Sequence, residues 1–244
     1  MRNGKKWIAV SLLIIVEGIF LLGKNMTKNS DNQEREYFLT GNGAHCEIAV
    51  GDLSGQQVVI HMKDYSLSGT EAPVLTILGT ADVKLILEGE NRVETVATEG
   101  DQVYPVIRAE GSLDISGDGS LTVNGVHQDG IRVGKQFSMN SGTLFINAGN
   151  NGIRSEDSID IGGGTLHVRA DNNGLKAQGK QKEDNGMIRI SGGELHVLAG
   201  DDALEAGALV QISGGKTFLD AEDYLIHCNG EQELSEGCVF YEKQ

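Results

Sequence analysis

The strongest constraint on the fold is an internal repeat between Gly119 and about Gly230, with a copy that reads G-T-L-F-I-N-A-G-N-N-G-I. The opening glycines of the four clearest copies are Gly142, Gly164, Gly193 and Gly215. These glycines are 22, 29 and 22 residues apart. We interpret the extra polar segment in the long step, from Gln178 to Asn185, as a loop. Repeats of this length are typical of solenoids, in which each unit packs on its neighbours.

Each copy contains two short runs in which apolar and polar residues alternate. Leu144, Ile146 and Ala148 show the first run, and Ile159 and Ile161 show the second. A period of two indicates strands with one buried face, and no helical period occurs after residue 30. The sequence therefore predicts an all-β fold, a single-stranded parallel β-helix of about 22 residues per rung, with equivalent residues about 4.8 Å apart. The 34 glycines and two prolines agree with a narrow solenoid that has many tight corners.

The first 30 residues form a separate N-terminal segment. Arg2, Lys5 and Lys6 precede an apolar run, residues 7–22, that is interrupted by Glu17. A positive end followed by a short apolar run is typical of export signals. We favour an uncleaved signal-anchor helix that leaves the rest of the chain outside the cell. A cleaved signal peptide, or a buried N-terminal helix in a cytosolic protein, are the alternatives.

The remaining chain divides by the regularity of its repeats. A polar linker extends to residue 36, and residues 37–244 form the β-helix domain, with less regular first rungs at 37–110, regular rungs at 111–230 and a C-terminal cap at 231–244. Strand-like runs occur at 58–60, 74–77 and 83–87, and turns are expected at 41–43, 68–69 and 88–91. Residues 239–241 are expected to form the final strand.

Charge and cysteine content exclude several classes of protein. The formal net charge is −15, which argues against nucleic acid or an anionic membrane surface as a partner. Contact with the membrane is expected only through the N-terminal segment. Three cysteines are too few for a disulfide scaffold. Cys228 and Cys238 could pair outside the cell, which would leave Cys46 over.

Several segments resemble a family of bacterial surface carbohydrate-binding proteins. These segments are Leu121 to Gly125, Gln128 to Ile131, Ile190 to Gly193, Asp201 to Ala206 and Glu88 to Asn91. The resemblance covers residues 37–230. It implies a right-handed parallel β-helix, similar to small pectate lyases, that binds calcium and plant-type polysaccharides. The chain departs from the family pattern where asparagine pairs replace acidic residues and where Tyr224 replaces an Asp or Asn.

One corner of the predicted rungs gathers acidic residues. The candidate metal ligands are Asp171, Asp201, Asp202, Glu222 and Asp223. Carboxylates stacked about 4.8 Å apart repel each other unless a cation lies between them, and calcium accepts six to eight oxygen ligands. We therefore expect calcium here. Asn150 and Asn172 occupy the same corner in earlier rungs, where we expect a hydrogen-bonded ladder and the left-handed backbone that Asn tolerates.

Two outward columns are candidate carbohydrate-binding surfaces. The first column consists of Phe145, His167, His196 and Phe218. These rings alternate with buried residues, so they should form a flat strip that packs against sugar rings. The alternatives are that the linker or a loop covers the strip, or that the rings only stack across strands. The second column contains Arg154 and Lys176, which could pair with uronate carboxylates or neutralise the neighbouring acidic corner.

These observations favour a calcium-binding, non-catalytic protein outside the cell that binds a polysaccharide such as polygalacturonate or cellulose. The first alternative is a polysaccharide lyase similar to pectate lyases, in which Lys176 or Arg154 would abstract a proton. The second alternative is a surface adhesin or a structural β-helix. The sequence contains no phosphate-binding loop, no dinucleotide fingerprint and no recognisable catalytic triad.

Overall fold

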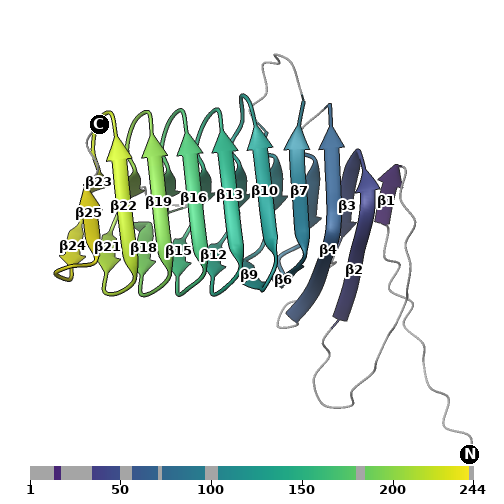
Figure 1. Cartoon of the computed structure of the whole chain (residues 1–244), viewed down its shortest axis with the longest axis horizontal. Helices are drawn as coiled ribbons and strands as arrows, with labels where there is room; N and C mark the ends of the chain where they lie inside the picture. Colours follow the sequence, from purple (N-terminus) through teal and green to yellow (C-terminus); the bar gives the residue numbers. More distant parts are fainter. Residues whose placement is uncertain are drawn as a thin grey trace, which may run out of the picture.

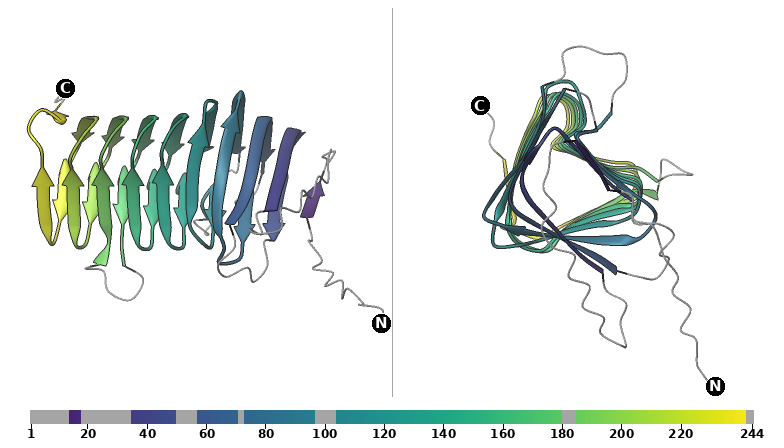
Figure 2. Two further views of the ribbon diagram at one scale, coloured as in Figure 1. Left: turned by 90° about the horizontal axis from the view of Figure 1, so that it is seen from below. Right: turned by 90° about the vertical axis from the view of Figure 1, so that its right-hand side faces the viewer.

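The computed structural model describes residues 14–17, 35–49, 57–70, 73–96, 104–179 and 185–241. Strands stack along one axis in these ranges (Figure 1), and every pairing except that of β1 with β3 is parallel. Seen end-on, the molecule has a triangular outline with three faces (Figure 2). The expected all-β solenoid is confirmed, whereas the handedness of its winding stays a prediction.

Face 1 carries the first strand of each repeat. Its strands are β7 (Glu90–Thr95), β10 (Ser120–Gly125), β13 (Thr143–Ala148), β16 (Thr165–Ala170), β19 (Glu194–Ala199), β22 (Lys216–Ala221) and β25 (Val239–Tyr241). Thr165 pairs with Thr143 on one side and with Glu194 on the other. The register of face 1 is therefore unaffected by the 29-residue step.

Face 2 carries the second alternating run. Its strands are β6 (Asp82–Glu88), β9 (Leu113–Gly117), β12 (Gln136–Met139), β15 (Ser158–Ile161), β18 (Met187–Ile190), β21 (Leu209–Ile212) and β24 (Glu231–Leu234). Ile159 pairs with Ile188 across β15 and β18. The inserted polar segment precedes β18, and its residues 180–184 lie outside the described residues.

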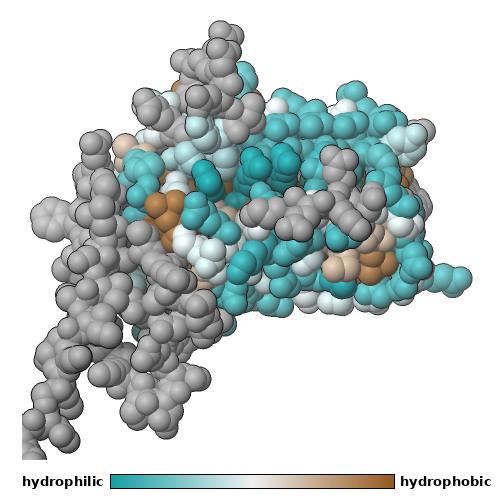
Figure 3. Space-filling view, turned by 180° about the vertical axis from the view of Figure 1, so that it is seen from behind, coloured by the Kyte–Doolittle hydropathy of each residue, from teal (hydrophilic) through white to brown (hydrophobic). Residues whose placement is uncertain are grey.

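Face 3 consists mostly of short strands that follow the corner after face 1. Its strands are β3 (His45–Ala49), β5 (Leu75–Leu78), β8 (Ile107–Ala109), β11 (Ile131–Val133), β14 (Ile153–Ser155), β17 (Leu175–Ala177), β20 (Leu204–Ala206) and β23 (Ile226–Cys228). A last strand, β1 (Ile14–Glu17), pairs antiparallel with β3. Seen from behind, opposite face 1, the visible described surface is mainly hydrophilic, with small separated apolar areas (Figure 3).

The N-terminal helix expected over residues 7–22 is not seen. Ile14–Glu17 are strand β1, and the remainder of the expected helix lies outside the described residues. Adjacent β-branched residues favour extended backbone and a sheet partner, which accounts for the strand. In the part of the chain that the structure describes, no helix has the length and apolar character needed to cross a membrane.

The first rungs contain a long strand that joins two faces. Residues 57–63 of β4 (Gln57–Gly69) pair with β6 on face 2, and residues 66–69 pair with β7 on face 1. β2 (Arg35–Gly43) pairs along β4 with a register shift after Thr40. The turns expected at 41–43 and 68–69 are therefore wrong: residues 41–43 continue β2 beyond the register shift, and residues 68–69 are the last two of β4. On the facing strand, Asp64 has a φ of 47° at this irregularity and its Oδ1 accepts a hydrogen bond from the Glu90 amide.

The core consists of columns of aliphatic side chains that run along the axis. Leu121, Leu144, Leu166 and Leu195 are aligned and almost completely buried. A second column contains Val123, Ile146, Val168, Val197 and Leu219. Each side chain packs on the rung before and the rung after, so stability is shared between neighbours. Because face 1 buries these columns inward, every intervening side chain points outward.

The glycine that opens each copy is required by the backbone. Gly142, Gly164, Gly193 and Gly215 have φ values of 84°, 83°, 79° and 76°, in the left-handed region that side chains with a Cβ rarely adopt. Each glycine turns the chain from face 2 into face 1. This explains why the repeat begins with glycine.

Candidate functional site: an aromatic ladder and an acidic corner

Five rings stack in line along face 1 and form the aromatic ladder. They are Phe145, His167, His196, Phe218 and Phe240. Successive ring centroids are 5.1, 4.8, 4.4 and 5.0 Å apart, and the angles between ring planes are 8°, 19°, 12° and 21°. The in-register pairing of β13, β16, β19, β22 and β25 fixes this spacing. The four rings expected to point outward do so.

The rings overlap obliquely instead of lying flat. Carbon atoms in contact are about 3.5–4.0 Å apart, so nearly parallel rings with centroids 4.4–5.1 Å apart are displaced sideways by roughly 2–4 Å. Each ring therefore exposes an edge and part of one face, and Phe145, at one end, is 42% exposed. The flat strip expected from the sequence is instead a ridged surface with apolar edges and imidazole nitrogens.

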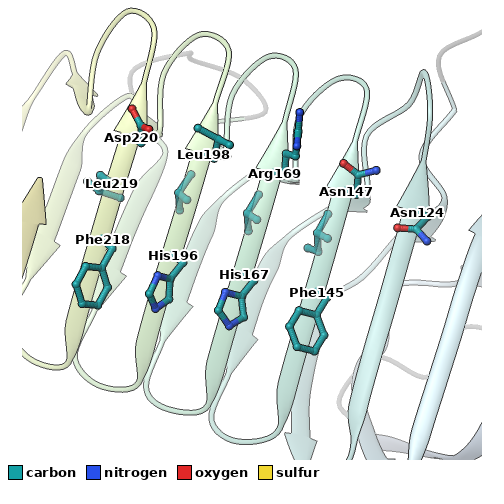
Figure 4. A pocket seen from close by; sticks show the side chains of 13 residues that line it. Asn124, Phe145, Asn147, His167, Arg169, His196, Leu198, Phe218, Leu219 and Asp220 are labelled. Carbon is teal, nitrogen blue, oxygen red and sulfur yellow. The ribbon is translucent and has the colours of Figure 1, made fainter. Parts of the chain in front are cut away.

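A shallow groove of about 350 Å³ runs beside the ladder. Its floor is the outward surface of β13, β16, β19 and β22, and Figure 4 shows a second row of side chains nearer the carboxyl ends of these strands. This row consists of Asn147, Arg169, Leu198 and Asp220, paired in register. The groove therefore combines an aromatic wall with an amide, a cation, an exposed leucine and a carboxylate.

The two imidazoles of the ladder have different environments. Burial lowers the pKa of His167, and the neighbouring His196 lowers it further. His196 Nε2 lies 2.8 Å from Glu194 Oε1, and this hydrogen bond lowers the pKa of the Glu194 carboxyl. Because protonation of His167 is disfavoured, the ladder keeps an uncharged imidazole next to Phe145.

Three of the five candidate metal ligands come together at the acidic corner. Asp201, Asp202 and Asp223 each place a carboxylate oxygen within 4.8 Å of the others. Asp171 and Glu222 are not in this cluster. The backbone amides of Asp171 and Glu222 donate hydrogen bonds to the carbonyl oxygens of Ala148 and Ala199. Asp171 and Glu222 therefore belong to the column one residue before that of Asp201 and Asp223, and Gly200 lies between them in this column. The expectation that all five form one site stays a prediction, with three of them brought together.

Asp202 is largely committed to the protein itself. It is 4% exposed, its Oδ1 accepts a hydrogen bond from the Tyr224 amide at 3.2 Å, and its Oδ2 lies 2.8 Å from His227 Nδ1. Asp201 is partly exposed and Asp223 is exposed. Any cation at this corner would therefore meet the accessible carboxylates of Asp201 and Asp223 and the buried carboxylate of Asp202, which its hydrogen bonds hold in place.

The asparagines before this corner form the expected ladder, since Asn172 Nδ2 donates to Asn150 Oδ1 at 3.1 Å, and the neighbouring column forms a second one. Asn151 Nδ2 donates to Asp129 Oδ1 at 2.8 Å, and Asn173 Nδ2 donates to Asn151 Oδ1 at 3.0 Å. The Asp202 amide then donates to Asn173 Oδ1 at 3.2 Å. The left-handed backbone expected at these positions is wrong, because Asp64 is the one non-glycine residue with positive φ in the described ranges. Hydrogen bonding between rungs, and not backbone conformation, explains the amides.

The basic column on face 3 is largely paired within the protein. Arg154 Nη2 donates to Gln178 Oε1 at 3.3 Å, and Lys176 Nζ forms an ion pair with Glu205 Oε2 at 2.5 Å. Arg132 lies 3.8 Å from Glu156. The partners recorded for this column are therefore glutamates and a glutamine on face 3 or at its edge, not the acidic corner. The assignment of Arg154 and Lys176 to carbohydrate binding stays a prediction.

Sequence reasoning missed two parts of the site. Phe240 was placed only in a final strand, although Gly237, Val239 and Phe240 continue the repeat register by another 22 residues after Gly215. The row with Arg169 was missed because its members belong to different residue types. Only an alignment of the outward positions that lie two residues after each ring would have found this row. The three cysteines are free thiols, so Cys228 and Cys238 are not joined.

Fold and site together define a parallel β-solenoid that presents a ladder of stacked rings and a groove along one face. Comparison with protein families matches residues 24–238 to the carbohydrate-binding domain-containing proteins. The chain belongs to this family, which confirms the resemblance at that level. A comparison with curated proteins finds no match.

A solved structure has a similar fold. The polysaccharide lyase-like protein from C. thermocellum, solved as a gadolinium derivative, is 22% identical in sequence. The match covers 85% of this chain and 87% of that chain, with a TM-score of 0.77. At this identity the likeness concerns the fold, and it agrees with the expected similarity to polysaccharide lyases in architecture.

Proposed function

We propose that this chain is an extracellular, calcium-binding, non-catalytic protein that binds acidic or plant cell-wall polysaccharides along the aromatic ladder. The apolar residues 7–22 would attach it to the cell surface. The aromatic ladder is the observation that carries the proposal. Carbohydrate binding by the family supports the class of ligand.

The geometry of the ladder favours an extended chain over a single sugar. The rings recur once per rung, and the groove runs beside them across β13, β16, β19 and β22. A polysaccharide lying along the axis would contact one ring edge after another. Its hydroxyl groups would meet the imidazole nitrogens of His167 and the amide of Asn147.

A second groove, on face 2, lacks these features. It measures about 230 Å³ and is lined mainly by polar side chains, without an aromatic residue. Asp114 Oδ1 already accepts hydrogen bonds from Ser138 and Asn140 there. The contrast in lining is the reason to place the polysaccharide on face 1.

The binding proposal is tested by removing rings from the ladder. Phe145→Ala with Phe218→Ala should weaken binding to immobilised polygalacturonate or cellulose by about tenfold or more, because burying an aromatic ring is worth roughly 1.5–3 kcal/mol. Phe38→Ala is the matched control, since Phe38 is 37% exposed and stacks on His61 at 4.6 Å, away from the ladder on β2. Equal losses in both variants, or no glycan binding by the wild type, would refute the proposal.

For calcium, the residues of the acidic corner fit the ion in their chemistry. Asp201, Asp202 and Asp223 offer only oxygen ligands, which calcium prefers. A bound ion would supply positive charge that offsets the repulsion among the three carboxylates. The buried Asp202, held by Tyr224 and His227, would present a fixed carboxylate to the ion.

Calcium is tested through stability, independently of glycan binding. Saturating calcium should raise the thermal midpoint by roughly 5–10 °C, from about 2.7 kcal/mol at one hundred times Kd and 2–4 °C per kcal/mol. Asp201→Asn with Asp223→Asn should abolish the rise. Asp171→Asn, which lies outside the cluster, should retain it. A midpoint that calcium leaves unchanged in the wild type would contradict calcium binding.

A polysaccharide lyase is the second candidate, favoured by the fold shared with the polysaccharide lyase-like protein. Lys176 would be its base, but the ion pair with Glu205 holds the ammonium group. Incubation with polygalacturonate should give no rise in unsaturated-uronate absorbance. A rise that disappears in Lys176→Ala would favour the lyase and refute the non-catalytic function.

A further inference from the structure

Arg169 differs from the other arginines whose side chains the structure describes. It is exposed on β16, two residues after His167 and on the same outward side of the strand. Arg92, Arg108, Arg132 and Arg189 each form an ion pair with a glutamate or aspartate, and Arg154 is bonded to Gln178. Among the described residues, no hydrogen bond or ion pair is recorded for Arg169.

The surroundings of Arg169 explain why it has no partner. Its in-register neighbours on face 1 are Asn147 and Leu198, neither of which carries a charge. Asp220 lies two strands away, roughly 10 Å at about 4.8 Å per strand, with Leu198 between the two strands, and no ion pair joins Asp220 to Arg169 in the described residues. Figure 4 shows Arg169 beside the groove, in the row next to the rings.

We propose that Arg169 is the residue that selects anionic polysaccharides at the aromatic ladder, by binding the carboxylate of a uronic acid. This inference rests on the proposed function, since it assumes that a glycan lies in the groove. Guanidinium and carboxylate form two parallel charge-assisted hydrogen bonds. A free guanidinium within the groove supplies this fork at the place where a sugar contacts Phe145 and His167.

The charge of the protein makes this position decisive. With a net charge of −15, the chain as a whole repels a polyuronate, so binding requires a local cation. Arg154 and Lys176, the cations expected from the sequence, are engaged by Gln178 and Glu205 on another face. Arg169 is on face 1 and is free to bind.

Asp220 has the opposite effect in the same groove. It lies in register with Arg169 through Leu198, and no partner is recorded for its carboxylate in the described part of the chain. A carboxylate on a sugar over β22 would be repelled there. The groove therefore has a cationic position at β16 and an anionic position at β22, and each makes an independent prediction.

The test compares binding of polygalacturonate with binding of a neutral β-glucan, using immobilised glycans and the full chain. Arg169→Ala should weaken polygalacturonate binding roughly ten- to hundredfold, as expected for lost hydrogen bonds to a charged group, and should leave the neutral glycan unchanged. Asp220→Asn should strengthen polygalacturonate binding, also without effect on the neutral glycan. Added salt should reduce the difference between the wild type and Arg169→Ala.

Arg189→Ala is the matched control, because it removes the same charge from face 2, where Arg189 pairs with Asp160 at 3.4 Å. Equal polygalacturonate affinity in Arg169→Ala and Arg189→Ala would overturn the inference, as would wild-type binding of the neutral glycan alone. Both of these results leave the proposed function standing. Wild-type protein that binds neither glycan would instead refute the proposed function, and the inference with it.

Discussion

Thr217 provides a direct test of how the solenoid is stabilised. On β22 it occupies the inward position that Leu195 occupies on β19, and its side chain is fully buried. Among the described residues its Oγ1 has no hydrogen-bond partner. A buried hydroxyl without a partner costs about 1–3 kcal/mol. Thr217→Val keeps the shape of the side chain and removes this cost, so we expect the free energy of unfolding to rise by about 1–2 kcal/mol.

Urea denaturation measures this change most directly. The midpoint should rise while the slope stays constant, because the surface exposed on unfolding is the same, and the thermal midpoint should rise by roughly 2–8 °C. Thr122→Val on β10 is the control, since Thr122 is partly exposed on the outward side and its substitution should change stability by less than about 0.5 kcal/mol. Glycan binding should not change, because Thr217 and Phe218 point to opposite sides of the strand.

One result would refute this reasoning. If Thr217→Val is no more stable than the wild type while Thr122→Val is neutral, the Thr217 hydroxyl must be hydrogen-bonded in the folded protein. The space left by a residue smaller than leucine would then be filled in another way. Thr217→Leu restores the side-chain volume present in the preceding rungs, so it would distinguish a hydrogen-bonded hydroxyl from unfilled space.

Two further predictions concern the ladders. Asn151→Ala should lower the free energy of unfolding by about 1–3 kcal/mol, because it leaves the buried Asn173 Nδ2 without its acceptor and removes one of the three hydrogen bonds to Asp129 Oδ1. The same change at the less buried Asn150 should cost less, and equal costs in urea denaturation would contradict this. The pKa of His167 lies below its ordinary value of 6.5 in the folded protein, so the unfolded chain binds more protons and stability must fall as the pH decreases from about 6.5 through the folded pKa. His167→Gln should reduce this loss in urea midpoints measured between pH 8 and 4, and an unchanged pH profile would count against the lowered pKa.

The inward half of the fold could be predicted from the sequence because packing restricts it. Leu144, Leu166 and Leu195 recur in register, and each forms part of one buried column. A large change at such a position leaves a cavity or causes strain, so the pattern is clear from a single sequence. The 29-residue step was also predictable, since an insertion between faces leaves the registers of both faces intact.

The first rungs and the N-terminal segment were harder to predict, for a physical reason. β4 changes from face 2 to face 1 within a single strand, which has no counterpart in the repeat. Glycine at Gly41 and Gly43 suggested a turn, but it also permits a bulge. For residues 7–22, apolar content alone does not distinguish a helix from a strand that pairs with an exposed edge such as β3.

The candidate site was only partly predictable because outward positions follow no packing rule. The rings were found because aromatic residues recur in one column, and the acidic corner because aspartates do. Arg169 shares its column with Asn147, Leu198 and Asp220, so no single residue type marks it. What gives Arg169 its significance is the absence of a partner among the described residues, and pairing of side chains cannot be read from repeat spacing.

The same division explains how this fold can acquire a binding surface. An inward substitution changes contacts with two neighbouring rungs, whereas an outward one on face 1 changes mainly what the surface presents to a ligand. Register then places each outward residue one strand from the next, so five separate sequence positions become one continuous ladder. The repeat that contains β22 can therefore have Thr217 in place of the core leucine and still present a ring at Phe218, because core packing restricts only the inward residue. Selection for a chain-like ligand would act on the outward columns and leave the solenoid beneath them unchanged.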